Sequence, residues 1–137
     1  MRKLADDRLW IGNALDARDL RRLYELEIAA VVDLAIEEKP AQLGREIVYC
    51  RFPLSDGAGN SPALVRLAID TVESLIRSQT TTLVACSAGM SRSPAIAAAA
   101  LARIDGRSPE DCLQGLVRDQ PHDVSPLFWQ AVRAVFG

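Results

Sequence analysis

The sequence predicts an α/β fold in which helices flank a central, mostly parallel β-sheet. Short apolar runs rich in β-branched residues alternate with segments whose apolar residues recur at helical spacing, and this alternation is typical of parallel sheets covered by helices. The chain has 137 residues, of which 49% are hydrophobic and 25% are charged, values that are ordinary for one packed domain. No repeat, low-complexity tract or linker interrupts it, so we expect a single domain over residues 1–137.

Four segments are expected to form the strands, because each is short and largely apolar. Residues 8–13 end in a Gly-Asn turn, and the segments 29–34 and 46–52 follow along the chain. The last segment, 80–85, reads Thr-Thr-Thr-Leu-Val-Ala and ends directly at Cys86. This strand would therefore carry a cysteine to one end of the sheet.

Capping residues mark where the helices begin. Two Ser-Pro pairs combine a capping hydroxyl with proline at the first helical position, and they predict helices that begin at Ser61 and Ser108. Asp16 is expected to cap an earlier helix, and two more helices are expected over about 92–104 and 125–135. In the helix that begins at Ser61 and ends near residue 77, helical spacing predicts a core face of Leu64, Leu67, Ile69, Val72, Leu75 and Ile76.

Charge and composition exclude several function classes. Sixteen basic and eighteen acidic residues give a net charge of −2, which is too balanced to indicate nucleic-acid binding or attraction to a membrane. No apolar run reaches the ~20 residues that span a bilayer. The three cysteines are far apart and odd in number, so they do not indicate a disulfide framework. The single histidine, His122, cannot form a metal site by itself. We therefore expect a cytoplasmic monomer that binds neither nucleic acid nor membrane and needs no metal or other cofactor.

The most informative stretch is residues 84–94, Val-Ala-Cys-Ser-Ala-Gly-Met-Ser-Arg-Ser-Pro. It joins a buried strand to a helix through a loop of small residues, and the backbone N–H groups of such a loop can cradle an anion. Gly89 gives the loop the backbone freedom that a tight turn around a ligand requires, and Arg92 can grip two oxygens of a tetrahedral anion. The expected phosphate-binding residues are Ser87, Ala88, Gly89, Met90, Ser91 and Arg92.

The same loop supplies a candidate nucleophile. Cys86 would lie below the bound anion with its sulfur aimed at phosphorus, and the loop amides, the helix dipole and Arg92 all favour the ionised thiolate. The hydroxyl of Ser93 would hydrogen-bond that thiolate and stabilise it as a leaving group. The alternative is that Cys86 is only a small buried hydrophobe at the end of a strand.

This loop resembles the Cys-x5-Arg signature of the protein tyrosine phosphatase superfamily, and the chain as a whole resembles a small dual-specificity phosphatase. Residues 9–13 and 28–34 resemble strands of that family, 51–56 resembles the stretch before its acid loop, and 125–129 resembles its closing helix. The resemblance implies a mixed sheet wrapped by helices. It also implies a cysteine-dependent hydrolase that acts on phosphotyrosine and/or phosphoserine/threonine of proteins through a phosphocysteine intermediate.

The resemblance further implies a general acid. In this family an aspartate about thirty residues before the cysteine protonates the leaving oxygen, and Asp56 lies thirty positions before Cys86. From the residues alone Asp56 is a turn residue in a Ser-Asp-Gly sequence, and Asn60 is a candidate for shaping its loop. The chain departs from the family at Ala85, where a histidine that helps to organise the loop usually stands, so we expect weaker activation of the thiol.

Other functions stay open. Arsenate reductases and rhodanese-like sulfurtransferases also use a cysteine in an anion-binding loop, but neither requires an acid placed like Asp56, and low-molecular-weight tyrosine phosphatases carry their signature near the N-terminus. A phosphoprotein-binding pseudophosphatase and a phosphatase of non-protein phosphate esters are the remaining alternatives. No lysine or arginine occurs at positions 87–91, which disfavours a highly charged lipid headgroup. Cys50 and Cys112 are expected to be packing residues, and Cys50 is a candidate for trapping an oxidised Cys86 as a disulfide.

Overall fold

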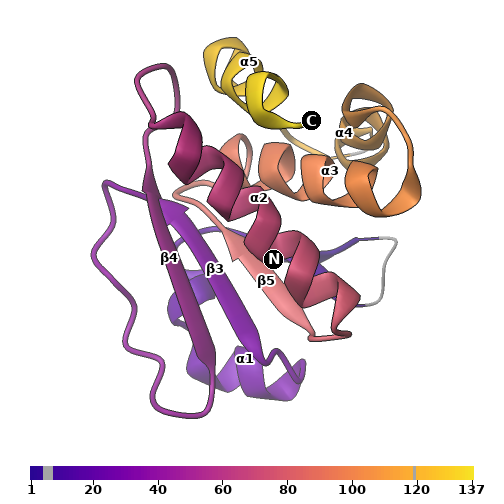
Figure 1. Ribbon diagram of the computed structural model, residues 1–137. Helices are drawn as coiled ribbons and strands as arrows, with labels where there is room; N and C mark the ends of the chain where they lie inside the picture. The colour runs from indigo at the N-terminus through magenta and orange to yellow at the C-terminus, as the bar shows by residue number, and fades with distance from the viewer. Residues whose placement is uncertain (5–7, 119) are drawn as a thin grey trace.

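The computed structural model describes residues 1–4, 8–118 and 120–137, and it contains a five-stranded mixed sheet with helices packed against it (Figure 1). The strand order is β1-β2-β5-β3-β4, in which β1 pairs with β2 antiparallel and all other pairs are parallel. This arrangement confirms the predicted α/β fold. The strands are β1 (Arg2–Lys3), β2 (Leu9–Gly12), β3 (Ala30–Ala35), β4 (Val48–Leu54) and β5 (Thr82–Ala85).

The four predicted strands correspond to β2, β3, β4 and β5, with bounds that differ by one or two residues. Strand β1 was not predicted, because two charged residues carry no apolar pattern. It forms through its pairing with β2, in which Arg2 lies opposite Ile11 and Lys3 opposite Trp10. Tertiary pairing at a sheet edge thus decides the conformation of β1, and local propensity does not.

The helices begin at the predicted caps with one exception. The Oγ atoms of the predicted caps Ser61 and Ser108 each accept a hydrogen bond from the N–H group three positions later. Ser125, for which no cap was predicted, does the same at the start of the last helix. Asp16 does not cap α1, however, because residues 16–18 form a 3₁₀ turn and Asp19 caps the helix instead. The helices are α1 (Leu20–Glu25), α2 (Pro62–Arg77), α3 (Arg92–Asp105), α4 (Pro109–Val117) and α5 (Pro126–Val135).

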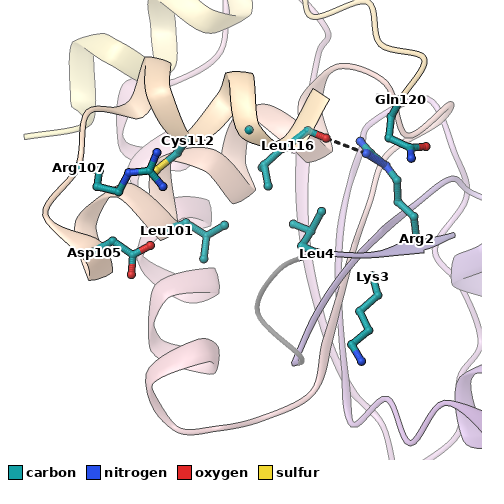
Figure 2. A pocket seen from close by; sticks show the side chains of 10 residues that line it. Arg2, Lys3, Leu4, Leu101, Asp105, Arg107, Cys112, Leu116 and Gln120 are labelled. Atoms are coloured by element: carbon teal, nitrogen blue, oxygen red, sulfur yellow. Dashed lines mark hydrogen bonds between the residues drawn. The ribbon is translucent and has the colours of Figure 1, made fainter. Parts of the chain in front are cut away.

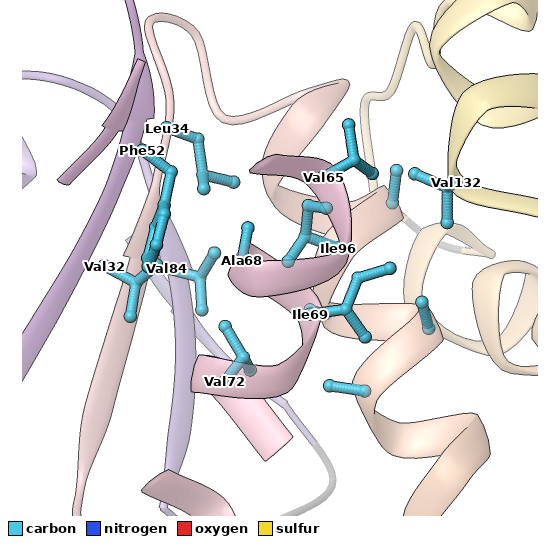
Figure 3. Close-up of a cluster of buried hydrophobic side chains, with 14 of the residues drawn as sticks. Val32, Leu34, Phe52, Val65, Ala68, Ile69, Val72, Val84, Ile96 and Val132 are labelled. Atoms are coloured by element: carbon cyan, nitrogen blue, oxygen red, sulfur yellow. The ribbon is translucent and has the colours of Figure 1, made fainter. Parts of the chain in front are cut away.

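The main core lies between the sheet and α2, α3 and α5 (Figure 3). Most of α3 is buried, and its run of alanines from 97 to 100 is fully inaccessible to solvent, which lets this helix contact β2, β3, β5 and the other long helices. The prediction for the core face of α2 is wrong at Leu67, which is 53% exposed. Helix α2 instead buries Val65 and Ala68 beside Ile69, because its inward stripe is rotated by about one residue from the predicted one.

The topology brings three loops to one edge of the sheet. Strands β3, β4 and β5 are parallel, so the loops that follow them, which begin at residues 36, 55 and 86, lie at the same end. In parallel sheets this edge is where ligands bind. Among the described residues no helix is long and apolar enough to cross a membrane.

Candidate active site

The loop from residue 86 to residue 91 packs closely against the end of β2. The N–H group of Cys86 donates to the carbonyl of Gly12 at 3.3 Å, and the N–H group of Ala14 donates to the carbonyl of Ser87 at 3.1 Å. Gly89 has a φ angle of +75°, and a Cβ there would lie 2.9 Å from the Gly12 carbonyl oxygen. The backbone freedom expected of Gly89 is therefore confirmed, and a larger residue would push the loop away from β2.

Arg92 is the first residue of α3, and its side chain is buried beneath the loop after β3. Its Nη1 atom donates to the Leu54 carbonyl oxygen and to Glu37 Oε1, both at 2.7 Å, and its Nη2 atom donates to Glu37 Oε2 at 2.6 Å. Burial lowers the pKa of Arg92, but the hydrogen bonds and the charge of Glu37 outweigh it, with a net rise. The same hydrogen bonds lower the pKa of Glu37, which therefore stays ionised at neutral pH.

Asp56 is held at the site by a serine of the loop. Ser91 Oγ donates to Asp56 Oδ1 at 2.6 Å, and it accepts the N–H group of Ser125 at 2.9 Å. Asn60 closes the loop that carries Asp56, because its side-chain amide exchanges two hydrogen bonds with the backbone of Ser55 at 2.8 and 2.9 Å. The predicted role of Asn60 in shaping this loop is therefore confirmed.

These side chains surround a cavity of about 220 Å³. Of the residues predicted for the site, Gly89 lies behind the cavity against β2, and Ser93 is fully buried in α3. The Ser93 Oγ atom has no hydrogen-bond partner among the described residues, so the expected hydrogen bond to the sulfur of Cys86 is not formed in this structure. The others all reach the cavity, which is lined by Glu37, Asp56, Cys86, Ser87, Ala88, Met90, Ser91, Arg92 and Asp123.

Three acidic residues at this edge were not predicted. Glu37 contacts Arg92, Glu38 Oε2 accepts a hydrogen bond from Ser87 Oγ at 2.6 Å, and Asp123 lines the cavity. For Glu37 and Glu38 the available sequence signal is that two adjacent acids stand just after a buried strand. Side chains at that position lie at the ligand-binding edge of a parallel sheet.

Two sequence expectations concern residues beside the site. His122, the single histidine, is exposed on the loop before α5, and residue 119 of the same loop lies outside the described residues. Ala85 is fully buried in a second apolar cluster that includes Leu23, Val31 and Leu83. The position of the missing histidine is thus filled by packing, and the loop is anchored through the backbone at Gly12 instead.

Residues 9–135 match the family model described as the dual specificity phosphatase catalytic domain. The chain belongs to this family. The match confirms the resemblance found in the sequence, and it indicates the predicted enzyme class, the protein tyrosine and dual-specificity phosphatases.

The individual proteins that the chain resembles are also dual specificity phosphatases. The chain is 29% identical over 118 residues to human dual specificity protein phosphatase 15 and 32% identical over 123 residues to dual specificity protein phosphatase Mpk3 of Drosophila melanogaster. These alignments cover 82% and 88% of this chain but 38% and 29% of the relatives, so the chain spans about a third of their length. The crystal structure of human DUSP28 is 23% identical, has a TM-score of 0.85, and is matched over 99% of this chain and 95% of that one. This likeness confirms the fold of the dual-specificity phosphatases.

Proposed function

We propose that this chain is a cysteine-dependent phosphatase that cleaves phosphomonoesters on proteins, with Cys86 as its nucleophile. The observation that carries the proposal is the meeting of Cys86, Arg92 and Asp56 around one cavity, in a chain that belongs to the dual specificity phosphatase family. Metal-free phosphoryl transfer through a covalent intermediate requires three groups: a thiolate nucleophile, hydrogen-bond donors to the phosphoryl oxygens and a carboxyl group that transfers a proton.

The reaction has two steps. In the first, the Cys86 thiolate attacks phosphorus, the bond from phosphorus to the ester oxygen breaks, and Asp56 gives its proton to the departing alkoxide or phenoxide. In the second, Asp56 takes a proton from water, the resulting hydroxide attacks phosphorus, and the sulfur–phosphorus bond breaks. Inorganic phosphate leaves and the thiolate is restored.

Two buried donors support this assignment. Within the part of the chain that the structure describes, Arg92 Nε and Ser93 Oγ are buried and have no hydrogen-bond partner. A buried donor without a partner is costly, and such groups in native proteins commonly mark a functional site. We assign Arg92 Nε to an oxygen of the phosphoryl group. Ser93 Oγ makes no hydrogen bond to the Cys86 thiol in this structure, and we propose that it turns toward the sulfur once Cys86 is ionised.

The test is hydrolysis of an aryl phosphate in the presence of EDTA and a thiol reductant. We expect turnover without added metal. Absence of turnover combined with tight binding of a phosphopeptide would instead indicate a pseudophosphatase, the alternative that Ala85 keeps open.

Ser91 is expected to hold Asp56 in the position from which it can protonate a leaving group. Ser91→Ala removes a 2.6 Å hydrogen bond, and hydrogen bonds to charged groups contribute ~1.5 kcal/mol or more, so we expect kcat on a phosphoserine peptide to fall roughly 10-fold. The matched control is Ser78→Ala, since the hydrogen bonds of Ser78 Oγ that the structure describes go to Leu75 and Thr80 at the far end of α2. Equal kcat values for wild type and Ser91→Ala would contradict this role.

Charge at the cavity indicates which protein substrates fit. Glu37, Asp56 and Asp123 line it, and Arg92 is the one cation among the described lining residues. We therefore expect a phosphotyrosine peptide with lysine or arginine beside the phosphoresidue to be hydrolysed with roughly 10-fold higher kcat/KM at low salt than its glutamate-flanked counterpart. The difference should narrow as ionic strength rises. A preference for the acidic peptide would show that these carboxylates do not face the substrate.

A further inference from the structure

We propose that a second cavity, between β1, α3 and α4, is a binding site for a small organic anion with an apolar body (Figure 2). The cavity has a volume of about 550 Å³, which is in the range of cavities that bind small organic molecules. None of the described residues that line it also lines the cavity of Cys86. The site is therefore separate from the candidate active site, and the proposal does not depend on the proposed phosphatase function.

The first observation that carries the proposal is the partly buried, uncompensated charge of Arg2. Its Nη1 atom donates to the Leu116 carbonyl oxygen of α4 at 2.9 Å, which holds the guanidinium at the cavity. Its Nη2 atom is shielded from solvent and has no hydrogen-bond partner among the described residues. No carboxylate of the described residues forms an ion pair with Arg2 either. Burial accordingly lowers the pKa of this guanidinium.

An anion in the cavity would supply what Arg2 lacks. A buried donor without an acceptor and a partly desolvated charge without a counter-ion both cost free energy. Since Arg2 lines the cavity, a small turn of its guanidinium would offer Nη2 to an oxygen bound there. A carboxylate or a similar group would then gain a charge-assisted hydrogen bond.

The second observation is the balance of charge on the cavity wall. Among the described lining residues, Arg2, Lys3 and Arg107 are cations and Asp105 is the one anion. The candidate active site has the opposite balance, with three acids around Arg92, and the whole chain has a net charge of −2. The potential of the second cavity therefore favours an anionic ligand against the average charge of the chain.

The third observation is the apolar surface that separates the two arginines. Leu4, Leu101 and Leu116 lie between Arg2 at one end of the cavity and Arg107 at the other (Figure 2). An inorganic anion beside Arg2 would leave this surface uncovered, and a neutral hydrocarbon would leave the charge of Arg2 uncompensated. The lining thus fits a molecule with an anionic group at one end and an aliphatic or aromatic body.

The experiment titrates the protein with butanoate, hexanoate, octanoate and decanoate and follows the methyl resonances of Leu101 and Leu116 by NMR. We expect saturable shifts and an affinity that rises with chain length, because each further buried CH₂ group adds to binding. Octanoate should bind roughly 10-fold more tightly than 1-octanol, which has no charge for Arg2. The proposal is wrong if none of the four carboxylates gives saturable shifts, or if octanoate and 1-octanol bind equally.

Arg2→Met tests the charged end of the site. The variant removes the guanidinium and keeps an unbranched apolar side chain, so we expect octanoate to bind roughly 10-fold more weakly. Arg21→Met is the matched control, because the Arg21 side chain is 91% exposed and pairs with Glu25 on α1. It should keep the wild-type affinity for octanoate. Equal affinities in wild type and Arg2→Met would overturn the proposal.

Gly115→Leu tests the cavity without touching β1, in case Arg2→Met does not fold. Gly115 lines the cavity from α4, and a Cβ there would meet no described atom within 4 Å outside the backbone of its own helix. Leucine also favours a helix more than glycine does, so the variant should fold. We expect it to lose octanoate binding, whereas Gln114→Leu at the neighbouring exposed position should retain it. Wild-type affinity in Gly115→Leu would contradict the site.

The Met90 methyl resonance distinguishes this cavity from the candidate active site. Met90 lines the cavity of Cys86, so its resonance should not move while those of Leu101 and Leu116 do. A shift of Met90 alone would place octanoate in the active-site cavity and overturn the proposal. None of these readouts requires turnover. Loss of the proposed phosphatase function would therefore leave this result unchanged, and absence of octanoate binding would leave the proposed function unchanged.

Discussion

Cys86→Ser is expected to abolish hydrolysis of aryl phosphates while leaving the binding of inorganic phosphate largely intact. A serine hydroxyl is not ionised near neutral pH and is a far weaker nucleophile than a thiolate, so kcat should fall by on the order of 10³ or more. The position of Arg92, which binds the phosphate, does not depend on the sulfur, because its guanidinium is fixed by Leu54 and Glu37. Initial rates and phosphate titration by calorimetry measure the two effects separately.

Cys112→Ser is the matched control for this variant. Cys112 is also a buried free cysteine, but it lies on α4 in a different apolar cluster. It lines a separate pocket of about 550 Å³ between β1, α3 and α4, together with residues such as Arg2 and Leu116 (Figure 2). We expect Cys112→Ser to keep wild-type kcat. Full activity in Cys86→Ser would show that another group carries out the chemistry.

Asp56→Ala has the second largest expected effect, a fall in kcat of ~10²–10⁴-fold on substrates with poor leaving groups such as phosphoserine peptides. The fall should be smaller for aryl phosphates whose leaving groups need little protonation. The measurement is kcat across a series of phosphate esters that differ in the pKa of the leaving alcohol or phenol. A steeper dependence on that pKa is the signature of a lost general acid.

Asp123→Asn distinguishes Asp56 from the other carboxylate with a comparable position. Asp123 lines the same cavity, and its N–H group donates to the Met90 carbonyl at 2.9 Å. Since no step of the proposed mechanism uses its carboxyl group, this variant should keep the wild-type dependence on leaving-group pKa. Steepening in Asp123→Asn, with none in Asp56→Ala, would reassign the general acid.

Local patterns predicted most of the fold, because strands and helices here are encoded by neighbouring residues. Two serine caps, Ser61 and Ser108, and four apolar runs correctly marked their elements. Leu67 was assigned to the core because a leucine at near-helical spacing cannot be told from one just outside the buried stripe. Asp16 was taken for a cap because a 3₁₀ turn before a helix has no distinct sequence signal. Strand β1 required the presence of its partner β2.

Some residues of the candidate site could likewise be predicted from the sequence, and others could not. Cys86 and Arg92 belong to one continuous loop, so their spacing alone indicated an anion site, while Asp56 was chosen only through the resemblance to a family. Glu37 and Glu38 reach the loop because β3 lies beside β5 in the sheet. That neighbour relation joins residues about fifty positions apart, and spacing within the sequence does not encode it.

The central claim is that a phosphoryl group passes through the sulfur of Cys86. The most direct measurement is rapid acid quenching of wild-type enzyme during turnover of an aryl phosphate, followed by mass spectrometry of the peptide that contains Cys86. We expect this peptide to gain one phosphoryl group in the wild type and none in Cys86→Ser. Phosphate release at the wild-type rate with no phosphorylated Cys86 peptide would contradict the account.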